Sequence, residues 1–213
     1  MIQTVILDLD GPILEGRFRH YACYEQILAT YSYTPIALEK YWQMKRERVD
    51  RRQLLAASGA ESIYPDFSRM WLDLIEQPCF LALDQLQPGV IEKLQLWRGK
   101  GLQLVLITLR RHSKHLNEQL VRLGIHDIFD YVLVSEYSGG GTGKTQQVKN
   151  VLTDITPQQC LWIGDTEVDI EGARALGCPI WAVTCGLRTE SYLQGLSPDF
   201  LSADVTQVVL ERW

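Results

Sequence analysis

Two aspartates stand where a short apolar run ends, near the beginning of the chain. Asp8 and Asp10 follow Val5-Ile6-Leu7 and precede Gly11-Pro12. A run of Val, Ile and Leu bounded by a Gly-Pro turn is typical of a buried strand in a parallel sheet. Ligands bind such sheets in the crevice outside the carboxyl ends of the strands. The two carboxylates are therefore candidates for a ligand site, although a lone Asp-x-Asp pattern more often only caps a turn.

Three later apolar runs also lead to residues that can take part in chemistry. Thr108 ends the first of these runs, Lys144 lies downstream of the second, and Asp165 ends the third after a glycine. Because the carboxyl ends of parallel strands meet at one edge of a sheet, we expect these side chains to converge with the aspartate pair. Asp169, four residues after Asp165, is close enough to support the same site.

This set of groups suits phosphoryl transfer. One carboxylate can attack phosphorus and form an acyl phosphate, which divides one difficult step into two. A second carboxylate can give a proton to the leaving group and later take one from water. Thr108 and Lys144 would then bind the phosphoryl oxygens, where negative charge accumulates.

Clustered carboxylates resist joint ionisation unless a cation lies among them. Mg²⁺ fits such a cluster because it prefers a few oxygen ligands and bridges to phosphate. We therefore predict an Mg²⁺ site with Asp165 as one ligand, and Asp169 as a supporting group for the metal or for Lys144.

A glycine-rich segment, Ser138-Gly139-Gly140-Gly141-Thr142-Gly143, precedes Lys144. One alternative is the phosphate-binding loop of a nucleotide-dependent kinase or ATPase. That motif needs a glycine where this chain has Ser138, and it leaves the aspartate pair and Thr108 without a role. We therefore interpret the segment as a flexible loop that presents Lys144.

Composition narrows the class of protein. With 213 residues, of which 46% are hydrophobic and 22% charged, the chain can bury a sizeable core. Its net charge of -5 argues against a nucleic-acid partner. No apolar run approaches the roughly 20 residues that span a bilayer and no leader is visible, so we expect a cytoplasmic protein without a membrane partner. The five widely spaced cysteines predict neither a disulfide framework nor a zinc site.

The pattern of apolar residues changes twice along the chain. Between residues 14 and 83 they recur at helical spacings, which predicts a helical insertion. From residue 88 onward, helical and strand patterns alternate, which predicts right-handed βαβ units and an α/β fold with a parallel sheet. The expected strands after the first are residues 102–107, 131–134, 160–163 and 180–183, and the expected helices are residues 89–97, 113–123, 144–152 and 169–176.

The motifs occur in the order found in the haloacid dehalogenase-like (HAD) hydrolase superfamily, and the chain resembles its phosphoglycolate phosphatase-like branch. The resemblance rests on Asp8-Leu9-Asp10-Gly11, on Thr108 closing Leu-Ile-Thr, on Lys144, and on Gly164-Asp165-Thr166-Glu167-Val168-Asp169-Ile170. It covers residues 1–13 and about 84–205. It implies a three-layer, Rossmann-like parallel sheet core formed by residues 1–13 and 84–213, with an inserted α-helical cap domain of residues 14–83.

The resemblance also implies roles for individual residues. Asp8 would be the nucleophile and Asp10 the general acid/base. The phosphate-binding positions would be Thr108, Leu109 and Lys144, the metal would be held by the Asp8 carboxylate, the Asp10 backbone carbonyl and Asp165, and Asp169 would support the site. Pro12 departs from the Thr or Val usual in similar proteins and has no amide proton. We expect activity to survive this change, with altered docking of the cap.

We therefore predict an Mg²⁺-dependent phosphatase that hydrolyses a small phosphomonoester, such as phosphoglycolate, a sugar phosphate or a nucleotide, through an aspartyl-phosphate intermediate. We expect the protein to be a monomer or a homodimer. One alternative is a phosphomutase of the β-phosphoglucomutase type, which would share every core residue and return the phosphate to its substrate. The other is a noncatalytic binding protein with the same fold, against which the intact acids and Lys144 argue.

Overall fold

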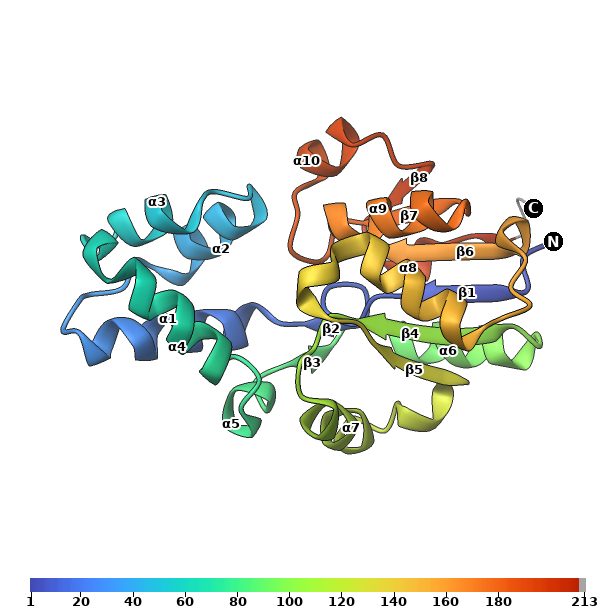
Figure 1. The fold of residues 1–213 in the computed structure, drawn as a ribbon, viewed down its shortest axis with the longest axis horizontal. Coiled ribbons are helices and arrows are strands. Elements are labelled where there is room, and N and C mark those ends of the chain that lie inside the picture. Colours follow the sequence, from blue (N-terminus) through green and yellow to red (C-terminus); the bar gives the residue numbers. More distant parts are fainter. Residues whose placement is uncertain (211–213) are drawn as a thin grey trace. The chain divides into compact units, whose positions relative to one another are not determined.

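The computed structural model describes residues 1–210, and at Tyr137 it describes the backbone alone. The chain divides into two compact units. The core unit comprises Met1–Glu15 and Leu86–Trp213, and the helical unit comprises Gly16–Gln85. Both units can be followed by colour in Figure 1, where the helical unit runs from blue to green.

A six-stranded parallel sheet forms the centre of the core unit (Figure 1). The chain reaches one side of β1 through β4 and β5, and the other side through β6, in the spatial order β5-β4-β1-β6-β7-β8. The strand order therefore reverses at β1, and such a reversal is where open α/β sheets bind ligands. The strands are β1 (Thr4–Leu7), β4 (Gln103–Thr108), β5 (Tyr131–Val134), β6 (Cys160–Gly164), β7 (Ile180–Val183) and β8 (Phe200–Ser202).

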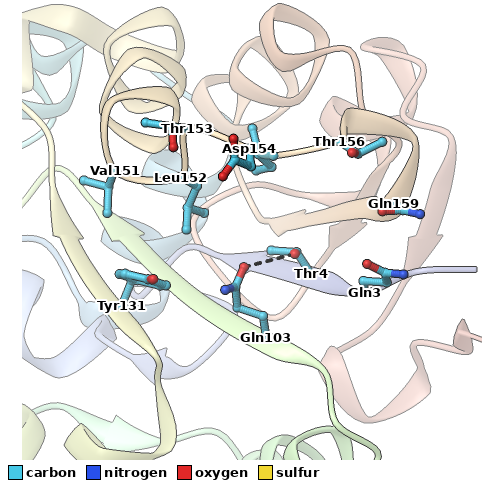
Figure 2. Close-up of a pocket in the computed structure, with 11 residues that line it drawn as sticks. Gln3, Thr4, Gln103, Tyr131, Val151, Leu152, Thr153, Asp154, Thr156 and Gln159 are labelled. Carbon is cyan, nitrogen blue, oxygen red and sulfur yellow. Dashed lines mark hydrogen bonds between the residues drawn. The ribbon is translucent and has the colours of Figure 1, made fainter.

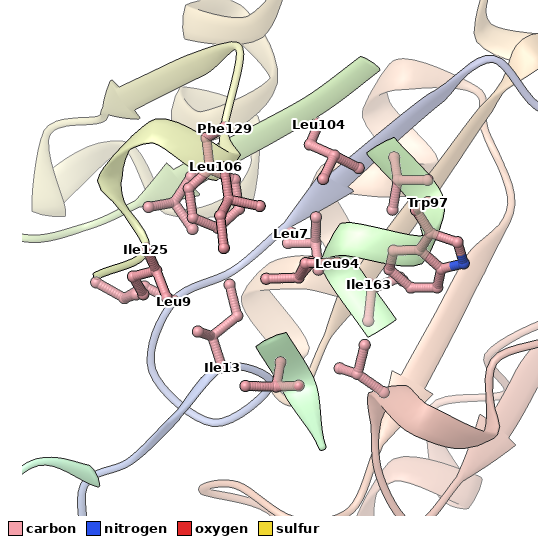
Figure 3. Packing of buried hydrophobic residues seen from close by; sticks show 14 of the residues in the cluster. Leu7, Leu9, Ile13, Leu94, Trp97, Leu104, Leu106, Ile125, Phe129 and Ile163 are labelled. Carbon is pink, nitrogen blue, oxygen red and sulfur yellow. The ribbon is translucent and has the colours of Figure 1, made fainter. Parts of the chain in front are cut away.

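Helices cover both faces of this sheet, because alternate strand side chains point to opposite faces. Leu7 packs in one buried cluster with Leu94 and Trp97 of α6 (Figure 3). Ile6, its neighbour, packs in a second cluster with Val148 of α8. The predicted three-layer α/β architecture is thus confirmed. The helices of the core unit are α6 (Val90–Gly99), α7 (Ser113–Arg122), α8 (Gly140–Val151), α9 (Glu167–Leu176) and α10 (Glu190–Gly195), with short 3₁₀ helices at His126–Ile128, Tyr137–Gly139, Pro157–Gln159 and Val205–Gln207.

The turn after β1 explains how Pro12 is accommodated. Gly11 has a φ of 108°, which glycine adopts readily, and its N–H donates to the Leu14 carbonyl at 2.9 Å. The N–H of Ile13 donates to the Leu9 carbonyl at 3.2 Å. These bonds hold the turn without a donor at Pro12, so the proline leaves the turn intact. The chain then enters β2 (Leu14–Glu15), which pairs with β3 (Gln85–Leu86) in a two-stranded sheet.

The helical unit has its own buried cluster of aromatic and aliphatic side chains. The rings of Tyr24 and Tyr41 stack with centroids 4.6 Å apart, and those of Phe67 and Trp71 stack at 5.7 Å. The helical pattern predicted for this region is confirmed, and no described helix in the chain is long and apolar enough to cross a membrane. The helices of the helical unit are α1 (Arg17–Thr30), α2 (Leu38–Arg46), α3 (Arg51–Ala56), α4 (Tyr64–Leu74) and α5 (Pro78–Leu81), with a 3₁₀ helix at Glu61–Ile63.

The glycine-rich segment differs from expectation, because α8 begins inside it at Gly140. A Cβ on Gly141 would lie 2.6 Å from the backbone nitrogen of Gly172 in α9. The Thr145 hydroxyl donates to the Gly172 carbonyl at 2.6 Å, which holds the two helices together. The expectation of a flexible loop is therefore wrong, since the glycine permits close packing of two helices.

This packing makes a prediction for stability. Gly141→Ala should lower the free energy of unfolding by about 1–3 kcal/mol, because an added methyl group would overlap the backbone of α9. Gly99→Ala is the matched control at the end of α6, where nothing lies within 4 Å of the added carbon. Urea unfolding of both variants tests this, and equal stabilities would contradict the close approach.

Candidate active site

The carboxyl ends of β1 and β6 bring three aspartates together. Asp8 follows β1 directly, Asp165 follows β6, and Asp169 lies in the first turn of α9. One oxygen from each carboxylate lies within 4.8 Å of the others. The sequence-predicted convergence of these residues is present in the structure because β1 and β6 are adjacent parallel strands.

Lys144 reaches this cluster from α8 and is almost wholly buried. Its Nζ donates to Asp8 Oδ1 at 2.7 Å and to Asp169 Oδ1 at 2.9 Å. Burial acts to lower the pKa of Lys144, but the charges of Asp169 and Asp8 outweigh it and raise the pKa above its usual value. Lys144 is therefore a permanent cation that fixes one oxygen of each of these carboxylates.

Asp8 carries an unusual protonation equilibrium. Burial is the main cause that raises its pKa to about 7, against the lowering effect of Lys144, and the negative charges of Asp169 and Asp10 add to the rise. A divalent cation near Asp8 would favour the ionised form. Near pH 7 the Asp8 carboxyl is therefore partly protonated in the metal-free site, and cation binding would displace that proton.

Asp165 is fully buried and its pKa is raised well above the usual range, by burial first and then by the charges of Asp8 and Asp169. Its Oδ2 accepts a hydrogen bond from the Leu187 N–H, whereas its Oδ1 has no hydrogen-bond partner among the described residues. Buried polar atoms are normally paired, so this oxygen is suited to a cation. The donor set of the site thus fits a hard divalent metal.

Glycines make room for these acids. A Cβ on Gly11 or on Gly186 would overlap the carboxylate of Asp165, and a Cβ on Gly164 would overlap Asp169. Any larger residue at these three positions would displace a carboxylate. The spacing of glycines around the motifs therefore follows from the volume that the acids occupy.

Asp169 is engaged on both oxygens. Besides the bond from Lys144 to Oδ1, its Oδ2 accepts from the Thr166 hydroxyl at 2.8 Å and from the Thr166 N–H at 3.2 Å. These bonds cap the start of α9. Asp169 thereby orients Lys144, and Asp8 and Asp165 are the better suited of the three aspartates to ligate a metal.

Asp10 lies apart from this group of three carboxylates and forms an ion pair that sequence reasoning missed. Arg110 donates from Nε to Asp10 Oδ2 and from Nη2 to Asp10 Oδ1, both at 2.7 Å. The Arg110 side chain is 5% exposed and that of Asp10 is 21% exposed. The only sequence signal for Arg110 was its place two residues beyond Thr108, at the end of a strand.

The remaining predicted positions lie on neighbouring segments. Thr108, the last residue of β4, is buried and Leu109 is half-buried. The loop after β7 supplies the Leu187 N–H, and it is anchored where Arg188 donates to Glu167 from Nε at 2.7 Å and from Nη2 at 2.8 Å. Sequence reasoning did not assign Leu187 or Arg188 to the site.

Two other places are poorly suited to phosphate. A cavity of about 340 Å³ lies at the opposite, amino ends of β1 and β4, lined by Gln3, Thr4, Gln103 and others (Figure 2). Its lining contains no lysine or arginine, so an anion would meet no positive charge there. At the start of α8, the Gly141 N–H donates to the Glu171 carboxylate at 3.3 Å. An acid therefore occupies the helix start that the nucleotide-loop alternative would assign to phosphate.

Comparison with known proteins agrees with the fold and the motifs. A family model described as haloacid dehalogenase-like hydrolase matches residues 2–177. The phosphoglycolate phosphatase of Rhodobacter capsulatus is 24% identical over 191 residues, which cover 88% of this chain and 87% of that protein. The phosphoglycolate phosphatase of Synechococcus elongatus is 25% identical over 222 residues, covering 99% of this chain and 98% of that protein.

Among solved structures, a haloacid dehalogenase-like family protein, SP0104 from Streptococcus pneumoniae, superposes with a TM-score of 0.77. It is 20% identical and the match covers 100% of this chain and 99% of that chain. This likeness shows the fold.

The raised pKa of Asp8 makes a prediction for the metal-free protein. Folding raises this pKa from 3.8 to about 7, so the stabilising contribution is full below pH 4 and is lost as the pH rises through 7. In EDTA, the free energy of unfolding of the wild type should fall between pH 5.5 and pH 8. In Asp8→Asn this fall should be smaller by about 2 kcal/mol, because the titrating carboxyl is absent. Urea titrations at both pH values measure it, with exposed Asp154→Asn as control. The same pH dependence in all three proteins would contradict the assignment.

Proposed function

The chain belongs to the haloacid dehalogenase-like hydrolases, and on this premise we propose that it is an Mg²⁺-dependent phosphatase that hydrolyses a small phosphomonoester through an aspartyl-phosphate intermediate. The observation that carries the proposal is Asp8 at the tip of β1, bonded to the buried Lys144 and near Asp165, whose Oδ1 has no hydrogen-bond partner among the described residues. The phosphoglycolate phosphatases among its relatives support a small phosphorylated metabolite as the substrate.

In the proposed first step, an oxygen of Asp8 forms a bond to phosphorus while the bond from phosphorus to the leaving oxygen breaks. Asp10 gives its proton to that oxygen, so the leaving group departs as an alcohol. In the second step, Asp10 takes a proton from water as the water oxygen forms a bond to phosphorus and the bond from phosphorus to the Asp8 oxygen breaks. Inorganic phosphate departs, and the Asp8 carboxylate is regenerated.

The phosphoryl oxygens need positive charge and hydrogen-bond donors. We assign these roles to Lys144, the Thr108 hydroxyl and the Leu109 N–H. The bonds from Lys144 to Asp8 and Asp169 fix its ammonium before substrate arrives, so little reorganisation accompanies the reaction.

We assign the metal to the Asp8 carboxylate, the Asp10 backbone carbonyl and Asp165, with Asp169 holding Lys144. When bound, Mg²⁺ would neutralise charge on the phosphoryl oxygens and help to orient them. The fit rests on the hard oxygen donors and on Asp165 Oδ1, for which residues 1–210 offer no hydrogen-bond partner in the part of the chain that the structure describes.

We assign the role of cap to the helical unit, Gly16–Gln85. The domain boundaries expected from sequence, 13/14 and 83/84, remain a prediction about where the cap begins and ends. A cap would select the substrate and exclude water from the site during transfer.

The proposal is tested by phosphate release from a panel of small phosphomonoesters with Mg²⁺ or with EDTA. Turnover should require the metal and should fall at least about 10³-fold in Asp8→Asn, because the nucleophile is lost. Asp154→Asn, an exposed aspartate at the opposite end of the sheet, should behave as the wild type. Undiminished turnover in Asp8→Asn would overturn the mechanism. Transfer of the phosphoryl group to a second substrate molecule in place of water would favour the phosphomutase. Absence of turnover on every substrate would favour the noncatalytic protein.

Metal binding is tested by melting. A ligand that binds only the folded state stabilises it by about 2.7 kcal/mol at a concentration of 100 Kd, so Mg²⁺ should raise Tm in the wild type. Asp165→Asn should lose most of this rise, because it replaces with an amide the carboxylate whose Oδ1 finds no hydrogen-bond partner in the described part of the chain. Asp154→Asn again serves as the control. An equal rise in all three proteins would place the cation elsewhere.

A further inference from the structure

The ion pair between Arg110 and Asp10 has no role in the chemistry assigned so far. Two parallel hydrogen bonds of 2.7 Å join the guanidinium to both carboxylate oxygens. Such bidentate pairs restrict the carboxylate in distance and in plane, which a single bond cannot do. The pair therefore restricts where the Asp10 carboxylate can point.

The surroundings of the two residues differ. Arg110 lies two residues beyond β4 and is buried, with its side chain 5% exposed. Asp10 lies in the turn after β1, next to Gly11 with its φ of 108°, and its side chain is 21% exposed. A partly exposed side chain has more space in which to change rotamer than one enclosed by packed atoms. Arg110 is thus the fixed partner and Asp10 the residue that it orients.

We propose that Arg110 is the positioning residue for Asp10, holding the carboxylate where it can exchange a proton with the leaving oxygen and then with water. This inference rests on the proposed function, since it needs Asp10 to act as general acid/base. Arg110 acts through Asp10 and need not touch the substrate. Two of its three nitrogens, Nε and Nη2, already donate to the carboxylate.

A general acid matters most when the leaving group is a poor one. An alkyl phosphate such as glycerol phosphate needs a proton on its leaving oxygen, whereas p-nitrophenyl phosphate releases a stabilised anion. Misplacing a catalytic group can lower a rate about 10²-fold. Arg110→Gln should therefore lower kcat/KM about 10²-fold for glycerol phosphate and less than about 10-fold for p-nitrophenyl phosphate, with KM nearly unchanged.

The test is a double-mutant cycle of Arg110→Gln and Asp10→Asn, with both substrates and saturating Mg²⁺. In the Asp10→Asn background, Arg110→Gln should change kcat/KM less than about 3-fold, because the group that it positions is already lost. Arg110→Lys keeps the charge without the bidentate geometry and should fall between wild type and Arg110→Gln. It also provides a readout if Arg110→Gln does not fold, which circular dichroism and the Tm would reveal.

Each outcome of this cycle supports or contradicts the positioning role of Arg110. Coupled losses that are larger for the alkyl substrate support the inference. Additive losses with a raised KM would overturn it and make Arg110 a substrate ligand, and equal losses on both substrates would reduce Arg110 to a structural role. A wild-type protein that is inactive on both substrates and on the whole panel of phosphomonoesters, while folded and bound to Mg²⁺, would overturn the proposed function and this inference with it.

Discussion

The buried ammonium of Lys144 is the contact on which the site depends. Without it, Asp8 and Asp169 would be close carboxylates with little water to screen them, and removing one partner of a buried ion pair typically costs about 3–5 kcal/mol. The lysine must therefore arrive at a fixed depth. That depth is set by α8, which approaches α9 closely because Gly141 has no side chain. Gly141 and Lys144 lie three residues apart on one helix face, so the packing of the first positions the second.

The site is thus a consequence of how helices and strands pack, and its acids are held at the reversal of strand order. β1 has β4 on one side and β6 on the other, and each contributes a polar residue at its carboxyl end. Three glycines around Asp165 and Asp169 leave the volume that the carboxylates fill. The same glycines therefore serve both close packing and charge placement, because they leave the space in which the mutually repelling carboxylates lie.

Much of this could be predicted from the sequence where the signal is local. The apolar runs identify the core strands, and acids at their ends predict the cluster around Asp8. The prediction from sequence failed at positions whose structure depends on residues far away in the chain. Glycine disfavours helices, so a helix beginning at Gly140 is visible only once α9 is seen beside it. The pairing of Arg110 with Asp10 joins residues far apart in the chain, and the short edge strand β8 has little pattern of its own.

The central position of β1 also affects how the protein is made. Its residues are synthesised before those of β4 and β6, yet Thr4 pairs with Gln103, 99 residues later, and on its other side with Cys160. A growing chain therefore carries the buried strand β1 without its hydrogen-bond partners until β4 has left the ribosome. Asp165, held between Gly11 and the loop at Leu187, completes its surroundings only after that loop has been synthesised. Non-local pairing of this kind slows folding and exposes apolar segments to aggregation, so the strand that organises the site is also the one in greatest need of protection during synthesis.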